Sequence, residues 1–286
     1  MIYEGIVYRP PSESRSLIIQ ITVGCSYNRC TYCNMYKKKV YKTRDLDLII
    51  EDMIDARDIY DRVDKIFLAD GNGLVVDTYT LTEILKSIKK IFPECNSVSI
   101  YATPKDVLDK SQNDLKLLKD MGLKLIYMGI ESGSDKVLVN TNKGINSKEL
   151  IQAGQKVKKS GIILSTMIIS GLGGKKEWID HAEKTAMVLN EIQPDYLALM
   201  TLMVKKGTVL YDEVREGEFQ VLNKNELLKE TLLLIKSLEL NNCIIRSNHA
   251  SNNLVLKGDL PKDKMMVISE IEKNIIKEKN VIKLSF

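Results

Sequence analysis

The chain has 286 residues, of which 44% are hydrophobic and 28% are charged. This composition is typical of a soluble globular protein, and it excludes a collagen-like, disordered or disulfide-rich chain. The formal net charge of +4 is too small to indicate a nucleic-acid-binding protein. No apolar run approaches the roughly 20 residues that span a bilayer, and the first residues lack the features of a secretory signal. We therefore expect a cytoplasmic protein with no membrane partner.

Six short apolar segments rich in β-branched residues recur along the chain and predict strands. They are Leu17–Val23, Lys65–Ala69, Ser97–Tyr101, Lys124–Ile130, Ile162–Ile169 and Tyr196–Met203. Nearly continuous apolar runs of this length are typical of parallel strands that are covered on both faces. The segments between them must then supply the covering layers.

Apolar residues with helical spacing separate these strands. The predicted helices include Leu46–Ile54, Leu81–Ile88, Leu115–Met121, Ser147–Lys159, Lys176–Ile192 and Asn223–Leu240. Alternating strands and helices predict parallel strands joined by crossover helices. We therefore expect an α/β fold, a partial (β/α)6 TIM-type barrel of parallel strands, with a doubly wound sheet as the structural alternative.

No linker rich in glycine, serine or proline interrupts this pattern. We expect an N-terminal lead-in at residues 1–16, a barrel core at 17–240 and a C-terminal extension at 241–286. In the extension, Pro261 is expected in the first turn of a helix that Met265–Ile276 continue. This helix is expected to close the open side of the barrel.

Polar and glycine-rich residues follow every predicted strand. These segments are Gly24–Cys33, Asp70–Gly73, Ala102–Lys105, Glu131–Ser134, Ser170–Gly174 and Val204–Gly207. The carboxyl ends of barrel strands share one face, where active sites are built from the loops. The sequence therefore predicts an active site on that face.

Three cysteines, Cys25, Cys30 and Cys33, fall within nine residues. A tight cysteine cluster in a reduced compartment more often binds metal than forms a cross-link. Three thiolates can hold three irons of a [4Fe–4S] cluster and leave the fourth iron open to a ligand. The cysteines are thus candidate metal ligands.

Two other metal sites fit the same thiols. A structural Cys3His zinc site in a non-enzymatic module would need His181 or His249 as its fourth ligand. A ferredoxin-like electron carrier would need Cys95 or Cys243. Spacing alone leaves all three sites open.

The motif Cys25-x4-Cys30-x2-Cys33, with Tyr32 before its last cysteine, resembles that of radical S-adenosylmethionine (SAM) enzymes. It departs from the usual pattern by one extra residue in the first gap. The resemblance covers about residues 17–210. Gly129–Ser134 is similar to the fourth-strand motif of the elongator, methylthiotransferase and coproporphyrinogen-oxidase-like group. Arg9–Ser12 and Ser247–Asn252 resemble a bacterial subset of the superfamily, which specifies no substrate.

The resemblance implies a mechanism as well as a fold. The open iron would be chelated by the amino and carboxylate groups of SAM, and the reduced cluster would cleave SAM to a 5′-deoxyadenosyl radical. This radical would abstract hydrogen from an unidentified small-molecule substrate. A low-potential electron donor such as flavodoxin or ferredoxin would reduce the cluster.

The resemblance also assigns roles to residues at the strand ends. Tyr32 would lie near the adenine, and the Asp70-Gly71-Asn72 segment would receive the SAM ammonium through backbone carbonyls. The same segment is also an ideal turn with no ligand role. Glu131 would accept hydrogen bonds from a ribose hydroxyl, since a carboxylate that ends an apolar strand is costly to bury without a partner.

Other candidates are assigned on weaker grounds. Ser132 lies beside Glu131, Thr103 follows the third strand, and Ser170 and Gly171 would approach the nucleoside after the fifth. In this last motif the acid found in relatives is missing.

The segment after Cys243–Ile245 concentrates polar residues. If that strand runs parallel to the barrel, Arg246 would bind a substrate carboxylate or phosphate, and His249 would exchange a proton near neutral pH. A chain of capping turns explains the same residues.

Lysines follow several strand ends and would steer an anionic substrate or an acidic electron donor. They are equally explained as solvated loop residues balanced by nearby acids. They are Lys37–Lys39, Lys105, Lys143, Lys175, Lys176, Lys205 and Lys206.

Overall fold

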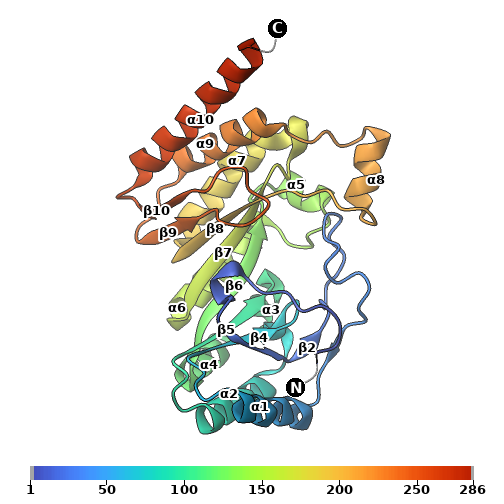
Figure 1. Cartoon of the computed structure of the whole chain (residues 1–286), viewed down its shortest axis with the longest axis vertical. Helices are drawn as coiled ribbons and strands as arrows, with labels where there is room; N and C mark the ends of the chain where they lie inside the picture. Colours follow the sequence, from blue (N-terminus) through green and yellow to red (C-terminus); the bar gives the residue numbers. More distant parts are fainter. Residues whose placement is uncertain (1–2, 285–286) are drawn as a thin grey trace. The chain divides into compact units, whose positions relative to one another are not determined.

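The computed structural model describes the backbone of residues 3–284 and the side chains of residues 3–277. In that part of the chain one sheet contains eight strands, and their order in the sheet is their order along the chain (Figure 1). The strands are β1 (Leu17–Gln20), β4 (Lys65–Ala69), β5 (Ser97–Ala102), β6 (Leu123–Glu131), β7 (Ile163–Ser170), β8 (Tyr196–Thr201), β9 (Cys243–Arg246) and β10 (Lys257–Leu260). A doubly wound sheet reverses its strand order at a switch point. The sequential order is that of a partial TIM-type barrel, as predicted.

The strand pairs are mostly parallel. β1, β4, β5 and β6 pair in parallel in that order, as do β8 and β9. β10 instead pairs antiparallel with β9, with Leu260 opposite Cys243. Parallel neighbours cannot be joined by tight turns and need crossover connections, which the intervening helices provide.

The helices begin and end at residues with recognisable signals. Asp45, Asp77 and Asn223 accept hydrogen bonds from first-turn amides of α1, α2 and α9. Gly122, with a φ of 115°, ends α4. The helices are α1 (Leu46–Ile59), α2 (Thr78–Ile91), α3 (Pro104–Asp109), α4 (Gln112–Met121), α5 (Asp135–Asn140), α6 (Ser147–Ser160), α7 (Gly174–Ile192), α8 (Val209–Glu216), α9 (Lys224–Ser237) and α10 (Lys264–Leu284), with 3-10 turns η1 (Pro11–Glu13) and η2 (Gly73–Val75).

The chain divides into two compact units. Unit 1 comprises the described chain up to Asn28, then Met35–Gly129 and Ala153–Ser165. Unit 2 comprises Arg29–Asn34, Ile130–Gln152 and the described chain from Thr166 onward. In unit 1, α2 packs against α1 and α4, and in unit 2, α9 packs against α7 and α10 (Figure 1).

The predicted strand at residues 17–23 is interrupted at Ile21. The Ile21 amide donates to the carbonyl of Ala69, while its own carbonyl accepts from the amide of Arg44. The chain then forms β2 (Thr22–Val23), which pairs antiparallel with β3 (Lys42–Thr43). A single apolar run is thus divided because its last residues pair with the returning chain after the cysteines.

The prediction for the C-terminal helix was wrong at its start. α10 begins at Lys264, and Pro261 lies in the preceding turn, where its carbonyl accepts from the Lys264 amide. The short helices α3, α5 and α8 and the edge strand β10 were not predicted, because elements this short carry little periodicity. Among the described residues, no helix combines the length and the apolar character needed to cross a bilayer.

Candidate functional site

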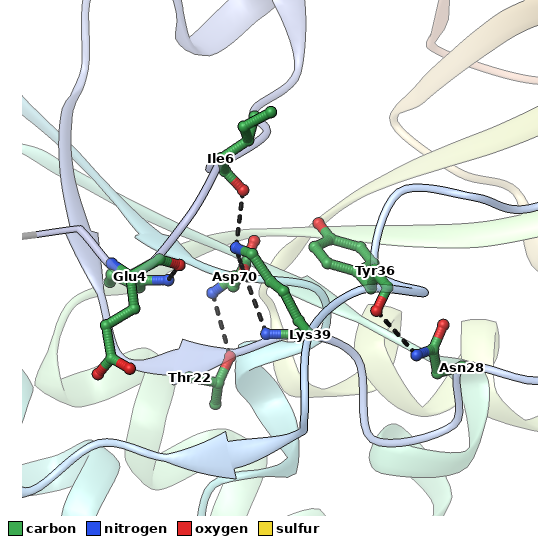
Figure 2. Close-up of polar contacts among 9 residues, drawn as sticks. Glu4, Ile6, Thr22, Asn28, Tyr36, Lys39 and Asp70 are labelled. Carbon is green, nitrogen blue, oxygen red and sulfur yellow. Dashed lines mark hydrogen bonds and ion pairs between the residues drawn. The ribbon is translucent and has the colours of Figure 1, made fainter.

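Asp70, at the end of β4 in unit 1, is completely buried and fixes the start of the cysteine loop. Its Oδ2 accepts hydrogen bonds from the Gly24 amide at 3.1 Å and from Lys39 Nζ at 2.5 Å. Figure 2 shows Lys39 beside Asp70, where Nζ also donates to the Ile6 carbonyl at 2.7 Å. The second oxygen, Oδ1, is buried and has no hydrogen-bond partner among the described residues. Asp70 therefore does more than form a turn.

The next two residues hold the cysteine loop by different means. A Cβ on Gly71 would lie 2.7 Å from the Gly24 carbonyl oxygen and 2.8 Å from Cys25 Cβ, so only glycine fits there. Asn72 is completely buried and accepts from the Ser26 amide at 2.9 Å. Its Nδ2 donates to Ser26 Oγ at 2.8 Å. The segment thus positions the backbone on both sides of Cys25.

Thr103 serves as a helix cap. Its Oγ1 accepts from the Asp106 amide at 3.2 Å, and Asp106 Oδ2 accepts from the Thr103 amide at 2.7 Å. The Asp106 carboxylate also accepts from Asn72 Nδ2 at 3.0 Å. Burial raises the pKa of Asp106, and these hydrogen bonds oppose the rise. The third-strand motif is therefore tied to the second through Asp106, a residue that sequence analysis missed.

In unit 2, residues 29–34 carry Cys30 and Cys33 and are held through their backbone. The Thr31 amide donates to the Thr141 carbonyl at 3.0 Å, and the Leu210 amide donates to the Thr31 carbonyl at 3.1 Å. Thr141 follows α5 and Leu210 lies in α8. Two short helices thus fix this cysteine segment.

Tyr32 lies in the electrostatic field of three other candidate residues. Burial raises the pKa of its phenol well above the usual value of 10, and the negative charge of Glu131 adds to the rise. Cys30 and Cys33 raise it further, Cys30 also through a hydrogen bond. The structure therefore brings Tyr32, Glu131 and two of the cysteines together within unit 2.

Glu131 ends β6 with a positive φ of 64°, a strained conformation for a residue with a side chain. Its Oε1 is 3.2 Å from Lys143 Nζ, and both side chains are largely buried. Its Oε2 is also buried but has no hydrogen-bond partner among the described residues. Glu131 thus repeats the arrangement of Asp70, with one oxygen on a lysine and the other unsatisfied.

The remaining strand-end candidates have partners within the protein. Ser132 Oγ contacts His181 Nδ1 at 2.8 Å and accepts from the Ser134 amide at 3.1 Å. The Gly171 amide donates to Glu230 Oε1 at 2.7 Å. The Ser170 carbonyl accepts from the Leu202 amide. The Ser132 hydroxyl therefore forms its hydrogen bonds with other residues of the protein.

A small pocket lies at the ends of β7, β8 and β9. It is lined by Ser170, Leu199, Thr201, Leu227, Ser247 and Asn252, among others. Asn252 Nδ2 donates to the carbonyls of Leu199 at 2.7 Å and Ser247 at 2.9 Å. Ser247 and Asn252, the two ends of the polar segment Ser247–Asn252, therefore both line this pocket.

The structure brings neither Arg246 nor His249 into the pocket lining. The guanidinium of Arg246, an exposed side chain, lies 5.6 Å from the centroid of the Tyr196 ring. His249 Nδ1 accepts from the Ser251 amide at 3.1 Å and contacts Ser251 Oγ at 2.8 Å. β9 does run parallel to β8, as the substrate hypothesis requires, but the local contacts are those of a turn.

The cysteines and histidines form no preassembled single-ion site among the described residues. No disulfide links the five cysteines, all of which lie in the described part of the chain. Between residues 3 and 277, no three His, Cys, Asp or Glu side chains converge on a point that would hold a metal ion. His181 faces Ser132 and His249 faces Ser251.

Comparison with known proteins adds the family context. The model of the radical SAM superfamily matches residues 19–186. The heme chaperone HemW of Buchnera aphidicola subsp. Acyrthosiphon pisum is 24% identical over 231 residues, which are 77% of this chain and 59% of HemW. The tRNA-2-methylthio-N(6)-dimethylallyladenosine synthase of Clostridium tetani is 23% identical over 255 residues, 84% of this chain and 53% of that enzyme.

Among solved structures, coproporphyrinogen III oxidase (HemN) from Escherichia coli, a radical SAM enzyme, superposes with a TM-score of 0.56. It shares 17% identity, and the match covers 78% of this chain and 52% of HemN. Similarity at this level shows a common fold. The chain spans between half and three-fifths of the length of the first curated relatives that it matches.

Proposed function

The chain belongs to the radical SAM superfamily, and from this premise we propose that Cys25, Cys30 and Cys33 hold a [4Fe–4S] cluster that binds SAM. The observation that carries the proposal is that the family match, over residues 19–186, includes all three thiols and both half-satisfied carboxylates, Asp70 and Glu131. The superfamily consists of enzymes, so we propose an enzyme that acts on a small-molecule substrate of unidentified structure.

The residues present fit these cofactors chemically. Thiolates are the ligands that iron–sulfur clusters require, and no disulfide occupies the three thiols. The missing side chain of Gly71 brings the second strand-end loop against Cys25. Buried carboxylate oxygens without a partner are unfavourable, and Asp70 Oδ1 and Glu131 Oε2 are two such acceptors. Donor groups of a bound ligand would satisfy them.

A cluster held by Cys25, Cys30 and Cys33, with SAM bound to it, would supply the one-electron chemistry that starts hydrogen abstraction from the substrate. The protein contributes placement. The Gly24–Asp70–Lys39 contacts fix the backbone before Cys25. Glu131 Oε2 would accept a hydrogen bond from a ribose hydroxyl of SAM, and Tyr32 would pack near the adenine of SAM. Lys143 offsets the charge of Glu131 at Oε1, and Oε2 is left as a hydrogen-bond acceptor.

A test of the metal site uses anaerobic reconstitution with iron and sulfide. We expect the wild-type protein to take up about four irons per chain, as the formula of the cluster requires. The reduced cluster should give an EPR signal that changes when SAM is added. The EPR signal should no longer respond to SAM in any of the three variants Cys25→Ala, Cys30→Ala and Cys33→Ala. Cys95→Ala and Cys243→Ala are matched controls and should behave as wild type. Stoichiometric zinc without iron uptake would instead establish the zinc module, and a redox-active cluster indifferent to SAM would establish an electron carrier.

The basic loop after Cys33 supports an acidic, low-potential electron donor such as flavodoxin or ferredoxin as the partner. Lys37 and Lys38 are exposed, and Val40 is 88% exposed. The loop packs on the backbone next to Cys25, since a Cβ on Gly24 would lie 3.2 Å from Lys39 Cβ. A positive patch accelerates encounter with an acidic partner.

Lys38→Glu should therefore slow cluster reduction by reduced flavodoxin and leave reduction by dithionite unchanged. Lys229→Glu, a substitution of an exposed lysine on α9, serves as the charge-matched control. This partner surface would be contradicted if Lys38→Glu slowed cluster reduction equally with both reductants, or did not slow reduction by flavodoxin.

We also propose a cytoplasmic location, with boundaries of the barrel core between residues 16 and 17 and between residues 240 and 241.

A further inference from the structure

Two buried side chains on neighbouring helices connect two strand-end loops of unit 2. His181 lies in α7 and Glu230 in α9, and each side chain is 2% exposed. His181 Nδ1 contacts Ser132 Oγ, at the end of β6, at 2.8 Å. Glu230 Oε1 accepts from the amide of Gly171, at the end of β7, at 2.7 Å. His181 Nε2 and Glu230 Oε1 are 3.8 Å apart, so the pair spans the two loops.

The same loops rest directly on the same helices. A Cβ on Gly133 would lie 2.3 Å from the Lys184 carbonyl oxygen of α7. The Gly133 amide donates to Thr185 Oγ1 at 2.8 Å. A Cβ on Gly171 would lie 2.9 Å from Leu227 Cδ2 of α9. Because the Gly133 loop lies against the backbone of α7 and Gly171 is bonded to Glu230 of α9, the spacing of α7 and α9 sets the spacing of the loops.

The contact is between neutral groups. Burial raises the pKa of Glu230 to about 8, against which the hydrogen bond from Gly171 works. Burial lowers the pKa of His181 to about 4. At neutral pH Glu230 is therefore mostly protonated and His181 is neutral. Glu230 acts on Gly171 as a hydrogen-bond acceptor and not as a charge, so glutamine is its closest replacement.

We propose that Glu230 and His181 are positioning residues that hold the Glu131–Ser134 and Ser170–Gly174 loops in register for SAM. Neither side chain needs to touch the cofactor. Ser132 follows Glu131 directly, so a shift of Ser132 moves the carboxylate. Gly171, whose φ is 86°, is bonded through its amide to Glu230, so a shift of Glu230 moves the second loop. The inference rests on the proposed function, because it takes these loops as the SAM-contacting segments.

The test compares Glu230→Gln with Glu230→Leu. Gln keeps the acceptor oxygen for the Gly171 amide, and Leu removes it. We expect amide hydrogen exchange in residues 129–135 and 170–174 to be at wild-type rates in Glu230→Gln and faster in Glu230→Leu. In the reconstituted enzyme, Glu230→Leu should weaken SAM binding by about tenfold, as expected for one lost buried hydrogen bond. Glu230→Gln should bind SAM as wild type does.

Leu234→Ala is the control for general destabilisation, since Leu234 is buried in α9 one turn beyond Glu230. It should lower the melting temperature without changing exchange in the two loops. The inference is overturned if Glu230→Leu leaves exchange and SAM affinity unchanged, if Glu230→Gln is equally impaired, or if Leu234→Ala gives the same loop exchange. Failure of wild type to bind SAM would instead refute the proposed function, and the exchange comparison would still decide the positioning role.

Discussion

At the scale of single residues, Asp70 and Glu131 share one arrangement. Each places one oxygen on a lysine, Lys39 and Lys143 respectively, and leaves the other unsatisfied. A buried carboxylate is costly unless it is paired. The lysine offsets that cost, and the second oxygen remains an acceptor. The pairing thus makes the burial of each acid compatible with the binding role that we propose for it.

Glu131→Gln should weaken SAM binding by about 1.5–3 kcal/mol, the range for a hydrogen bond to a charged group. The substitution keeps the shape of the side chain but removes its charge. Affinity for SAM in the reconstituted enzyme is the measurement, with Glu183→Gln, an exposed position on α7, as the control. Unchanged affinity in Glu131→Gln would make Glu131 a purely structural partner of Lys143.

The sequence singled out Asp70 and Glu131 as candidate site residues, but it did not predict that Lys39 and Lys143 pair with them. An acid that ends an apolar run is visible in the sequence, whereas Lys39 and Lys143 look like any other loop lysines. Lys39 is 31 residues from Asp70, and Lys143 is 12 residues from Glu131. One feature of the sequence does mark Glu230 as unusual. It is an acid between the apolar positions Leu227-Leu228 and Leu232–Ile235 of a predicted helix. Its bond to Gly171 depends on tertiary packing, which periodicity does not encode.

At the scale of elements, basic side chains of one helix bind the carbonyls that end the next. Arg57 of α1 donates to the Ile91 carbonyl at the end of α2 at 3.1 Å. Lys89 of α2 donates to the Asp120 carbonyl near the end of α4 at 3.3 Å. The last carbonyls of a helix lack partners within it and carry partial negative charge. These contacts thus satisfy the helix ends and fasten neighbouring helices of unit 1.

Glu94 completes the contacts of Arg57 and makes stability dependent on pH. The hydrogen bond from Arg57, followed by that from the Val63 amide, lowers the pKa of Glu94 from 4.5 to about 2. A carboxyl with a lower pKa in the folded state stabilises the fold above its ordinary pKa. This stabilisation is lost as the pH falls from about 4.5 toward 2.

Urea unfolding of wild type and Glu94→Gln across this pH range measures the effect. The variant should be less stable than wild type at pH 6, and the difference should shrink steadily below pH 4.5. A difference that stays constant with pH would show that the charge of Glu94 has no part in it.

Element prediction succeeded for continuous apolar strands and for long helices with clear periodicity. The predicted strand at Lys65–Ala69 has the bounds of β4, and the predicted helix at Lys176–Ile192 lies within α7. It failed for α3, whose six residues are organised by the Thr103–Asp106 capping box. That signal was present in the sequence but was taken for a ligand motif.

For the whole molecule, strand order was the decisive prediction. Glycine-rich strand ends and a sequential order together belong to a barrel-type fold, and both the sheet and the family match agree with it. The division into two units could not be predicted, because each unit draws on segments far apart in the sequence, such as Arg29–Asn34 and Ile130–Gln152.

The central claim is that this chain uses its three clustered thiols to cleave SAM. The most direct measurement is 5′-deoxyadenosine formed from SAM by the anaerobically reconstituted protein with dithionite, quantified by chromatography. We predict 5′-deoxyadenosine from wild type and Cys95→Ala and none above background from Cys30→Ala. A Cys30→Ala protein that forms 5′-deoxyadenosine at the wild-type rate, or a wild-type protein that carries the cluster and forms none, would contradict the claim.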